Sequence, residues 1–390
     1  MSDVGPIVLN PSRVGTAHQM ATRIVFFLSG CCVSAWAPLI PFAKNRLQLD
    51  DGRLGLLLLC CGIGSVIMMP LAGVLAGRYG CRRMITILGA LACCMLPLLV
   101  IAKNVPQLAV VLFVFGAACG ALDTTMNIHA VLVERESGRA MMSGFHGLWS
   151  VGGIVGAGSI SMMISAGAMP LTASIIVAVT LLILLGAAYK SLLPIGNDSN
   201  GPAFAWPHGQ VLLLGCFCFV LFLAEGSVLD WSGVFLTSVR RVATAHAGFA
   251  YVAFSTAMTV CRLIGDSIVR AVGSARVVLF GSLLAAAGFL LAVLVPSTAI
   301  VILGFGLVGV GASNVVPIMF SAAGRQTSMP TNLAIPAMTI LAYSGNLTGP
   351  ALVGFLANVF GLSVGLAVIA GMLVAVALIS TRTNLSNVRT

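Results

Sequence analysis

Three acidic residues lie inside long apolar stretches of this 390-residue chain, and they are the groups best suited to chemistry. Asp123 lies in one such stretch, and Glu225 and Asp230 lie together in another. A carboxylate within hydrocarbon costs about 2.5–3.5 kcal/mol on insertion scales, so acids kept there commonly bind protons, ions or polar ligands. We therefore expect these three residues to include the groups that bind and release protons.

Asp123 shares one helix face with two glycines and an amide. Gly116, Gly120, Asp123 and Asn127 are separated by four, three and four positions, which places all of them on one side of a helix. Such a face could bind a proton or a polar group of a substrate. The alternative is a structural role, in which Asp123 pairs with Asn127 or with a neighbouring helix.

Glu225 and Asp230 are five residues apart, so their side chains point about 140° apart on a helix. The two side chains therefore cannot both face the same cavity. Glu225 is deeper in its stretch, and we expect it to be the main proton carrier. Asp230 is nearer the end and is expected either to pair with Arg240 or Arg241 as an outer gate or to anchor the topology.

A short charged loop follows the stretch that contains Asp123. Glu134 continues the Asp123 face to the end of its helix, with Arg135, Glu136 and Arg139 close behind. An ion network here could close the inner face and break when a cavity opens inward. Solvated loop charges would give the same pattern.

Several uncharged polar and aromatic groups could line a cavity. Tryptophans suit a sugar or another ring, although tryptophans near helix ends also form interfacial belts. The amides and the tyrosine could equally join helices by hydrogen bonds. His146 could titrate near neutral pH, but a hydrogen bond to a loop carbonyl is the favoured interpretation. The expected cavity residues are Trp36, Asn127, Trp149, Trp231, Asn314, Tyr343 and Asn346.

Transmembrane helices must position these groups. Only 8% of the residues are charged and the mean hydropathy is +1.09, a balance outside the range of soluble domains. A spanning helix needs about 20 mostly apolar residues, and the chain offers such windows about a dozen times. We expect twelve helices, near 22–43, 54–77, 84–103, 106–130, 142–166, 170–190, 209–237, 246–269, 276–295, 298–320, 331–358 and 362–380.

Positive charges predict the orientation and exclude some partners. With both termini in the cytoplasm, 14 of the 20 Lys and Arg residues fall on the inside, as the positive-inside rule requires. We therefore expect a multi-pass protein of the inner membrane. The net charge of +10 then reflects topology and anionic lipid headgroups, and no contiguous basic stripe indicates nucleic acid.

The chain divides into two halves of six windows each. A segment rich in Pro, Gly, Asn and Ser separates them, and FLSGCCVSAW at 27–36 is echoed by FLAEGSVLDW at 222–231. By this alignment Gly30 and Ala35 occupy the positions of Glu225 and Asp230. We expect an N-terminal tail 1–21, a six-helix bundle 22–193, a linker 194–208, a second bundle 209–380 and a C-terminal tail 381–390. Parallel repeats of this kind place a substrate site between the halves.

The loop after the second window resembles the loop motif Gly-x-x-x-Asp-Arg-x-Gly-x-Arg-Arg of the major facilitator superfamily. Gly77 stands where the motif has Asp, and a looser echo in the second half contains Asp266. In that family the loop pins the halves together on the cytoplasmic side, so the missing acid puts its usual salt bridge in doubt. The residues that match the motif are Gly73, Arg78, Gly80, Arg82 and Arg83.

Longer stretches, including the one that begins MNIHAVLVERESGRAMMSGFHG at Met126, resemble the YbjJ-type branch of that superfamily. The resemblance covers nearly the whole chain. It implies an all-α fold of two six-helix bundles related by a pseudo-twofold axis, and a secondary transporter of unnamed cargo. Relatives of similar layout include fucose–proton symporters and drug exporters.

Other function classes lack their motifs. The chain has no phosphate-binding GxxxxGK[ST], no HExxH and no serine elbow, so neither an ATP-driven transporter nor an enzyme is expected. The 11 cysteines form no metal-binding array, and we expect neither metal nor cofactor. We expect a monomer that takes up a small polar, sugar-like solute with protons. The alternative is proton-coupled efflux of amphipathic compounds.

Overall fold

The computed structural model describes residues 15–49, 51–195, 205–242 and 249–383, and within these ranges the fold is helical with no strand. Eleven helices are long and apolar enough to cross a bilayer, and a bent pair supplies a twelfth span if its two parts are counted together. The expectation of an all-α protein with twelve spans is therefore confirmed. The linker residues 196–204 lie outside the described residues.

The first half contains six spans, the first of which continues into two short helical segments. Its elements are α1 (Thr16–Ala35), η2 (Ala37–Leu39), α2 (Ile40–Arg46), α3 (Asp51–Tyr79), α4 (Cys81–Ile101), α5 (Val105–Ser137), α6 (Met142–Ser165) and α7 (Pro170–Tyr189).

The second half repeats this order, with more interruptions. Its elements are α8 (Gly209–Val234), the π-helical turn η3 (Phe235–Val239), α9 (Phe249–Leu263), α10 (Gly265–Val272), α11 (Ser274–Leu294), α12 (Thr298–Ala312), α13 (Val315–Arg325), α14 (Thr331–Phe360) and α15 (Leu362–Ser380).

Two spans differ from the continuous helices that hydropathy predicts. The expected window 246–269 is divided into α9 and α10, which meet at Ile264 with a bend of 62°. The expected window 298–320 is divided into α12 and α13 at Ser313 and Asn314. Hydropathy detects apolar length only, so it cannot reveal a break inside an apolar run.

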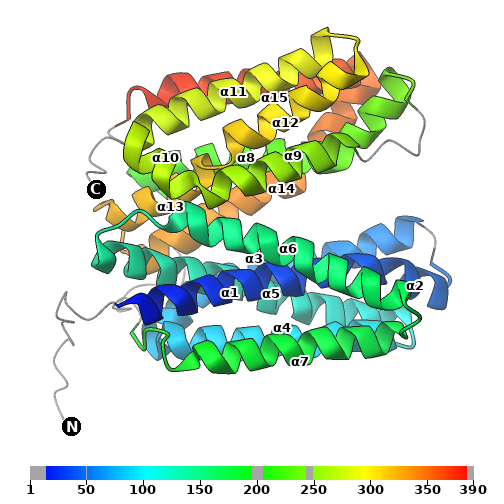
Figure 1. Cartoon of the computed structure of the whole chain (residues 1–390), viewed down its shortest axis with the longest axis vertical. Helices are drawn as coiled ribbons and strands as arrows, with labels where there is room; N and C mark the ends of the chain where they lie inside the picture. The colour runs from blue at the N-terminus through cyan, green and yellow to red at the C-terminus, as the bar shows by residue number, and fades with distance from the viewer. Residues whose placement is uncertain (1–14, 50, 196–204, 243–248, 384–390) are drawn as a thin grey trace.

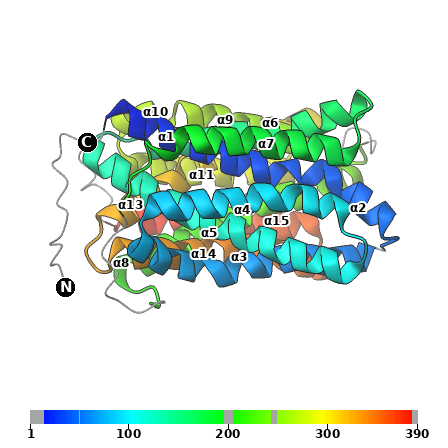
Figure 2. The same cartoon turned by 90° about the horizontal axis from the view of Figure 1, so that it is seen from below.

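The two halves form two stacked bundles, with α1–α7 in one and α8–α15 in the other (Figure 1). The interface between them is built from α3, α5 and α6 on one side and α9, α10, α13 and α14 on the other. The start of α1, α10 and α13 lie at one end of the molecule, and α2 lies at the opposite end (Figure 2). We call the first of these the inner end, after the expected topology.

Glycines allow the helices of each bundle to touch backbone to backbone. A Cβ atom on Gly116 of α5 would lie 1.9 Å from the carbonyl oxygen of Cys61 on α3. Gly309 of α12 approaches Phe254 of α9 in the same way, at 2.2 Å. Small residues are the usual means of close helix approach in lipid, where apolar burial alone gives little drive.

Two glycines of α6 offer a matched test of this packing. A Cβ atom on Gly156 would lie 2.1 Å from the Cys31 carbonyl oxygen, whereas nothing lies within 4 Å of one on Gly158. We expect Gly156→Ala to lower the free energy of unfolding by about 1–3 kcal/mol through overpacking. Gly158→Ala should be neutral or slightly stabilising, since alanine favours helix. Thermal unfolding of the two purified variants measures the difference, and equal midpoints would contradict it.

Candidate functional site

An ion pair between an acid of α8 and an arginine of the neighbouring helix α9 lies at the centre of the site. Nη2 of Arg262 is 3.2 Å from Oε1 and 3.4 Å from Oε2 of Glu225. The side chains are only 7% and 19% exposed, respectively. Removing one partner of such a buried pair costs about 3–5 kcal/mol, because the other charge is left uncompensated. The two residues therefore act as one unit.

Arg262 also joins the two halves of the molecule. Its Nη1 donates to Oγ of Ser150 on α6 over 3.2 Å, and its Nε donates to the carbonyl oxygen of Ser313 over 3.1 Å. Positive-inside counting treats Arg262 as a flanking charge, and so the sequence reasoning missed it. The signal was present, because Arg262 lies within an apolar window of the same half as Glu225.

The breaks in two helices make this geometry possible. The Ser313 carbonyl would normally accept from the residue four positions later, but that residue is Pro317, which has no N–H. The free carbonyl is therefore available to Arg262. Beside it, Nδ2 of Asn314 donates to the carbonyl of Cys261 over 3.2 Å, near the end of α9. Asn314 thus ties the two breaks together, and broken helices near the middle of a span are typical of transport sites.

Asp123 forms a second link between the halves. Its carboxyl group interacts with the hydroxyl of Tyr343, so α5 is joined to α14. Of the two structural alternatives, the contact with a neighbouring helix is the one present, because Nδ2 of Asn127 donates to the Asp123 backbone carbonyl over 2.9 Å and not to the carboxylate. Oδ1 of Asn127 is buried and has no partner among the described residues. It is available to a donor from a ligand or from water.

The two links lie on different contacts between the bundles. Ser150 and Arg262 join α6 to α9, and Asp123 and Tyr343 join α5 to α14. A relative rotation of the bundles would have to break or rearrange both. Of the sequence-predicted acids, Asp123 takes part in one of these links directly, and Glu225 reaches the other through Arg262.

The predicted aromatic residues are distributed within the halves. Trp231 packs on α14, where a Cβ atom on Gly354 would lie 3.2 Å from its ring. Trp149 packs its backbone against Gly30 of α1, and Trp36 is buried at 6% exposure. The Nε1 atoms of Trp36 and Trp231 have no partner among the described residues. Asn346 is exposed and lies beside Gly226.

Two of the contacts expected for polar groups near the ends of spans are absent from the described part of the chain. Arg240 does not pair with Asp230, because its Nη2 donates to the carbonyls of Ala292 and Val293 over 2.8 and 2.7 Å. His146 is not bonded to a loop carbonyl within the described part of the chain. Its ring lies between those of Phe26 and Phe320, at centroid distances of 5.3 and 5.5 Å, and its Nε2 is buried without a partner.

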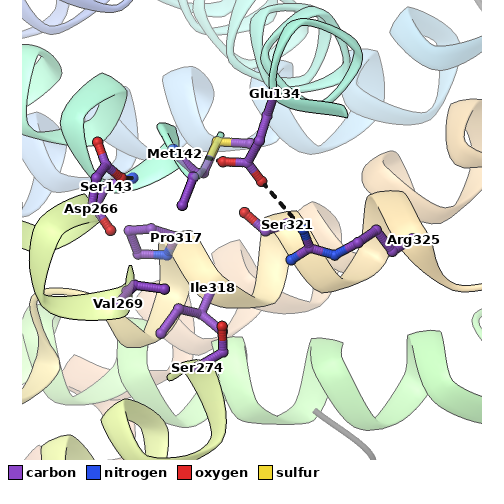
Figure 3. Close-up of a pocket in the computed structure, with 11 residues that line it drawn as sticks. Glu134, Met142, Ser143, Asp266, Val269, Ser274, Pro317, Ile318, Ser321 and Arg325 are labelled. Atoms are coloured by element: carbon purple, nitrogen blue, oxygen red, sulfur yellow. Dashed lines mark hydrogen bonds and ion pairs between the residues drawn. The ribbon is translucent and has the colours of Figure 1, made fainter. Parts of the chain in front are cut away.

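The inner end is closed by two carboxylates at the start of α6 (Figure 3). Asp266, from the second half, accepts from the amides of Ser143 and Gly144, each over 3.0 Å. Glu134 accepts from the amides of Met141 and Met142 over 2.8 and 2.9 Å. A helix N-terminus offers such free amides and a favourable dipole. The carboxylates line a cavity of about 20 Å³, so the bundles are in close contact here.

Only part of the expected loop network is present. Glu134 does form an ion pair, but with Arg325 of α13 at 3.9 Å rather than within its own loop. Arg139 is exposed and forms no ion pair among the described residues. The ionic closure therefore crosses between the halves, as a gate must.

The first-half loop motif is well packed without its acid. Gly73 packs directly on α14, where a Cβ atom would lie 2.3 Å from the carbonyl of Asn332. Arg82 donates to the carbonyls of Leu192 and Lys190 over 2.8 and 3.0 Å, and so it fixes the segment after α7. Gly80 has a φ of 84° and lies against the same segment at Pro194. Arg78 and Arg83 are exposed beside it and line a cavity of about 390 Å³.

The Asp266 cap can be tested by hydrogen exchange. Asp266→Asn should accelerate exchange of the amides at the start of α6, because bonds to a charged acceptor are worth about 1.5–3 kcal/mol and an amide oxygen is a weaker acceptor. Arg276→Gln, an exposed change near the same loop, should have no effect. Unchanged exchange of Ser143 and Gly144 in Asp266→Asn, measured by mass spectrometry, would mean that the cap does not hold the inner end closed.

Sequence comparisons identify relatives along nearly the full length. The family model described as Major Facilitator Superfamily matches residues 24–329. An uncharacterized MFS-type transporter of Yersinia pestis is 52% identical over 364 residues, covering 93% of this chain and 95% of that protein. Membrane protein MosC of Rhizobium meliloti is 31% identical over 364 residues, covering 92% and 88%.

Solved structures share the fold at low sequence identity. The E. coli fucose:proton symporter FucP superposes with a TM-score of 0.79 at 14% identity, covering 93% of this chain and 97% of that one. The proton:xylose symporter XylE gives 0.77 at 12% identity and 96% coverage of both chains. The fold, the relatives and the family model agree, and this chain belongs to the major facilitator superfamily of membrane transporters.

Proposed function

We propose that this protein is a proton-coupled secondary transporter that takes up a small polar solute by alternating access. Membership of the superfamily makes it a transporter rather than an enzyme. Proton coupling and uptake are the proposed part. The observation that supports them most directly is the buried pair of Glu225 and Arg262, which is linked through Ser150 to the other bundle.

The proposed mechanism begins with the inner end closed. Protonation of Glu225 from the outer side removes the charge that holds Arg262. The guanidinium is then free to leave Ser150, and the contact between α6 and α9 loosens. Once the bundles have rotated, Glu225 faces the cytoplasm, loses its proton and binds Arg262 again.

Asp123 is a second proton site in this proposal. Its partner Tyr343 lies on the other bundle, so the charge of Asp123 also depends on the distance between the halves. A neutral Asp123 can donate to a neighbour and a charged one can only accept. Protonation of Asp123 would therefore change the contact between α5 and α14 at the same stage of the transport cycle at which the contact between α6 and α9 changes.

The direction of transport is proposed as uptake. FucP and XylE, which share the fold, are proton symporters for fucose and xylose. We place the protein in the inner membrane as a monomer with both termini in the cytoplasm, as its positive charges indicate. Efflux of amphipathic compounds is the competing function.

A stability panel identifies a cargo for these tests. A ligand at 100 times its dissociation constant stabilises a protein by about 2.7 kcal/mol. Purified protein should be stabilised by a polar solute from a panel of sugars, nucleosides and organic acids. Stabilisation only by amphipathic cations would overturn uptake in favour of efflux, and the accumulation of the strongest ligand in cells with and without the gene then confirms the direction.

Glu225→Gln is the direct test of coupling. In proteoliposomes with an imposed pH gradient, this variant should lose uphill accumulation of that ligand and retain exchange of internal for external ligand, because exchange needs no net proton movement. Glu136→Gln, the same change in the last turn of α5, should accumulate normally. Uphill transport by Glu225→Gln at the normal level would refute the role of Glu225.

Asp123→Asn separates the two proton sites. The amide keeps a polar partner for Tyr343 but cannot exchange a proton, so the variant should show a reduced proton-to-solute ratio with its inner end still closed. Tyr343→Phe keeps the acid and removes the link, and it should leave the ratio unchanged while altering the rate. Parallel measurement of proton and solute fluxes distinguishes them, and an unaltered ratio in Asp123→Asn would leave Glu225 as the sole proton site.

A further inference from the structure

Arg262 poses a charge problem that follows from the proposed function. The residue is 6% exposed, and Glu225 is the acid that forms an ion pair with it among the described residues. A proton on Glu225 leaves the guanidinium charged, because arginine stays protonated in proteins. An uncompensated cation is then buried between the bundles, which low-dielectric surroundings oppose strongly.

None of the other groups near the pair can supply the missing negative charge. Ser150 and the Ser313 carbonyl are neutral. His146 is close enough for its titration to depend on Arg262, and its charged form would be a second cation. Cys218 and Tyr251, whose titrations depend on Glu225, have ordinary pKa values above physiological pH.

The other acids of the same region form no ion pair with Arg262 among the described residues. Asp230 is on the exposed part of α8, more than a helical turn beyond Glu225. Asp123 is engaged with Tyr343 of α14. No other acid among the described residues forms an ion pair with Arg262, so we expect the negative charge that replaces Glu225 to come from outside the protein.

We propose that Arg262 binds an anionic group of the substrate, and that the cargo is a small organic acid such as a sugar acid. A carboxylate matches the planar fork of a guanidinium and can take the place that the two oxygens of Glu225 occupy. This inference rests on the proposed role of Glu225 as the proton carrier. It also explains why proton and solute move together, since each binds well only when the other is present.

Charge balance supports this class of cargo. Before loading, Glu225 and Arg262 together are neutral. After loading, a protonated Glu225, a charged Arg262 and one monoanion are again neutral. One proton with one carboxylate therefore crosses with no change in the net charge of the buried site, whereas a neutral solute with a proton would leave one positive charge there.

Matched pairs of ligands test the class directly. Purified full-length protein is titrated with glucose and glucuronate, and with galactose and galacturonate, at pH 5.5 and pH 8, and thermal stabilisation is recorded. We expect the acids to bind at least tenfold more tightly than their neutral partners and to bind more tightly at the lower pH. Equal binding of acid and neutral sugar would overturn the proposal.

Substitutions of the pair give a second, independent measurement. Glu225→Gln leaves Arg262 without its acid, so acetate alone should raise the melting temperature of this variant at both pH values. The double variant Glu225→Gln with Arg262→Gln removes both charges, should fold without the anion, and should give no response to acetate. Glu136→Gln serves as the control and should behave as the unmodified protein. A response to acetate in the double variant would place the anion elsewhere.

The outcomes separate this inference from the function on which it rests. Proton-driven accumulation of a neutral sugar that is lost in Glu225→Gln would overturn the anionic cargo and keep the proposed function. Binding of acids that requires Arg262 but does not depend on pH or on Glu225 would overturn proton coupling at Glu225.

Discussion

The pairing of a buried acid with a buried base between α8 and α9 is the interaction on which the rest of this structure depends. A lone charge on Glu225 or on Arg262 would be costly within a bilayer, because the ion would lose its hydration without compensation. Together they are nearly neutral, and they can hold a bond to Ser150 on the opposite bundle. The same pair thus holds the closed state together and, in the proposed mechanism, would make it sensitive to a proton.

The helix breaks supply hydrogen-bond acceptors around this pair. A continuous helix satisfies its own carbonyls, so it offers nothing to an arginine. Pro317 frees the carbonyl of Ser313 for Arg262, and the end of α9 frees that of Cys261 for Asn314. Irregular backbone is tolerated at this depth because protein side chains, and not lipid, cover it. A carbonyl freed at a break thus takes the place of a water molecule beside the charged group of Arg262.

Much of this fold could be predicted from sequence, and the reasons are physical. Hydrocarbon thickness fixes the length of a span, so the windows match the helices closely, and the repeat around Trp36 and Trp231 indicates two halves. The acids were also found, because a charge in an apolar run is conspicuous. The partners of these acids were not predicted. Arg262 was counted as a flanking charge, and Tyr343 was treated as one of several cavity groups. Asp230 does not pair with Arg240. In each case the partners depend on how the helices rotate and cross, which the local sequence does not encode.

The inner closure is chemically unequal on its two sides. Where α6 meets the second half, the Asp266 carboxylate accepts from backbone amides, whereas the equivalent contact of α3 with α14 is made by Gly73 against the Asn332 backbone and the Pro336 ring, with no charged group. An ionic contact weakens in salt and releases abruptly once its geometry is lost, while a glycine contact between helices can roll and persist. The α3 and α14 side is therefore suited to act as a hinge and the α6 side as a latch. In the proposed uptake cycle, the inner end would then open first beside α6, while α3 and α14 stay in contact.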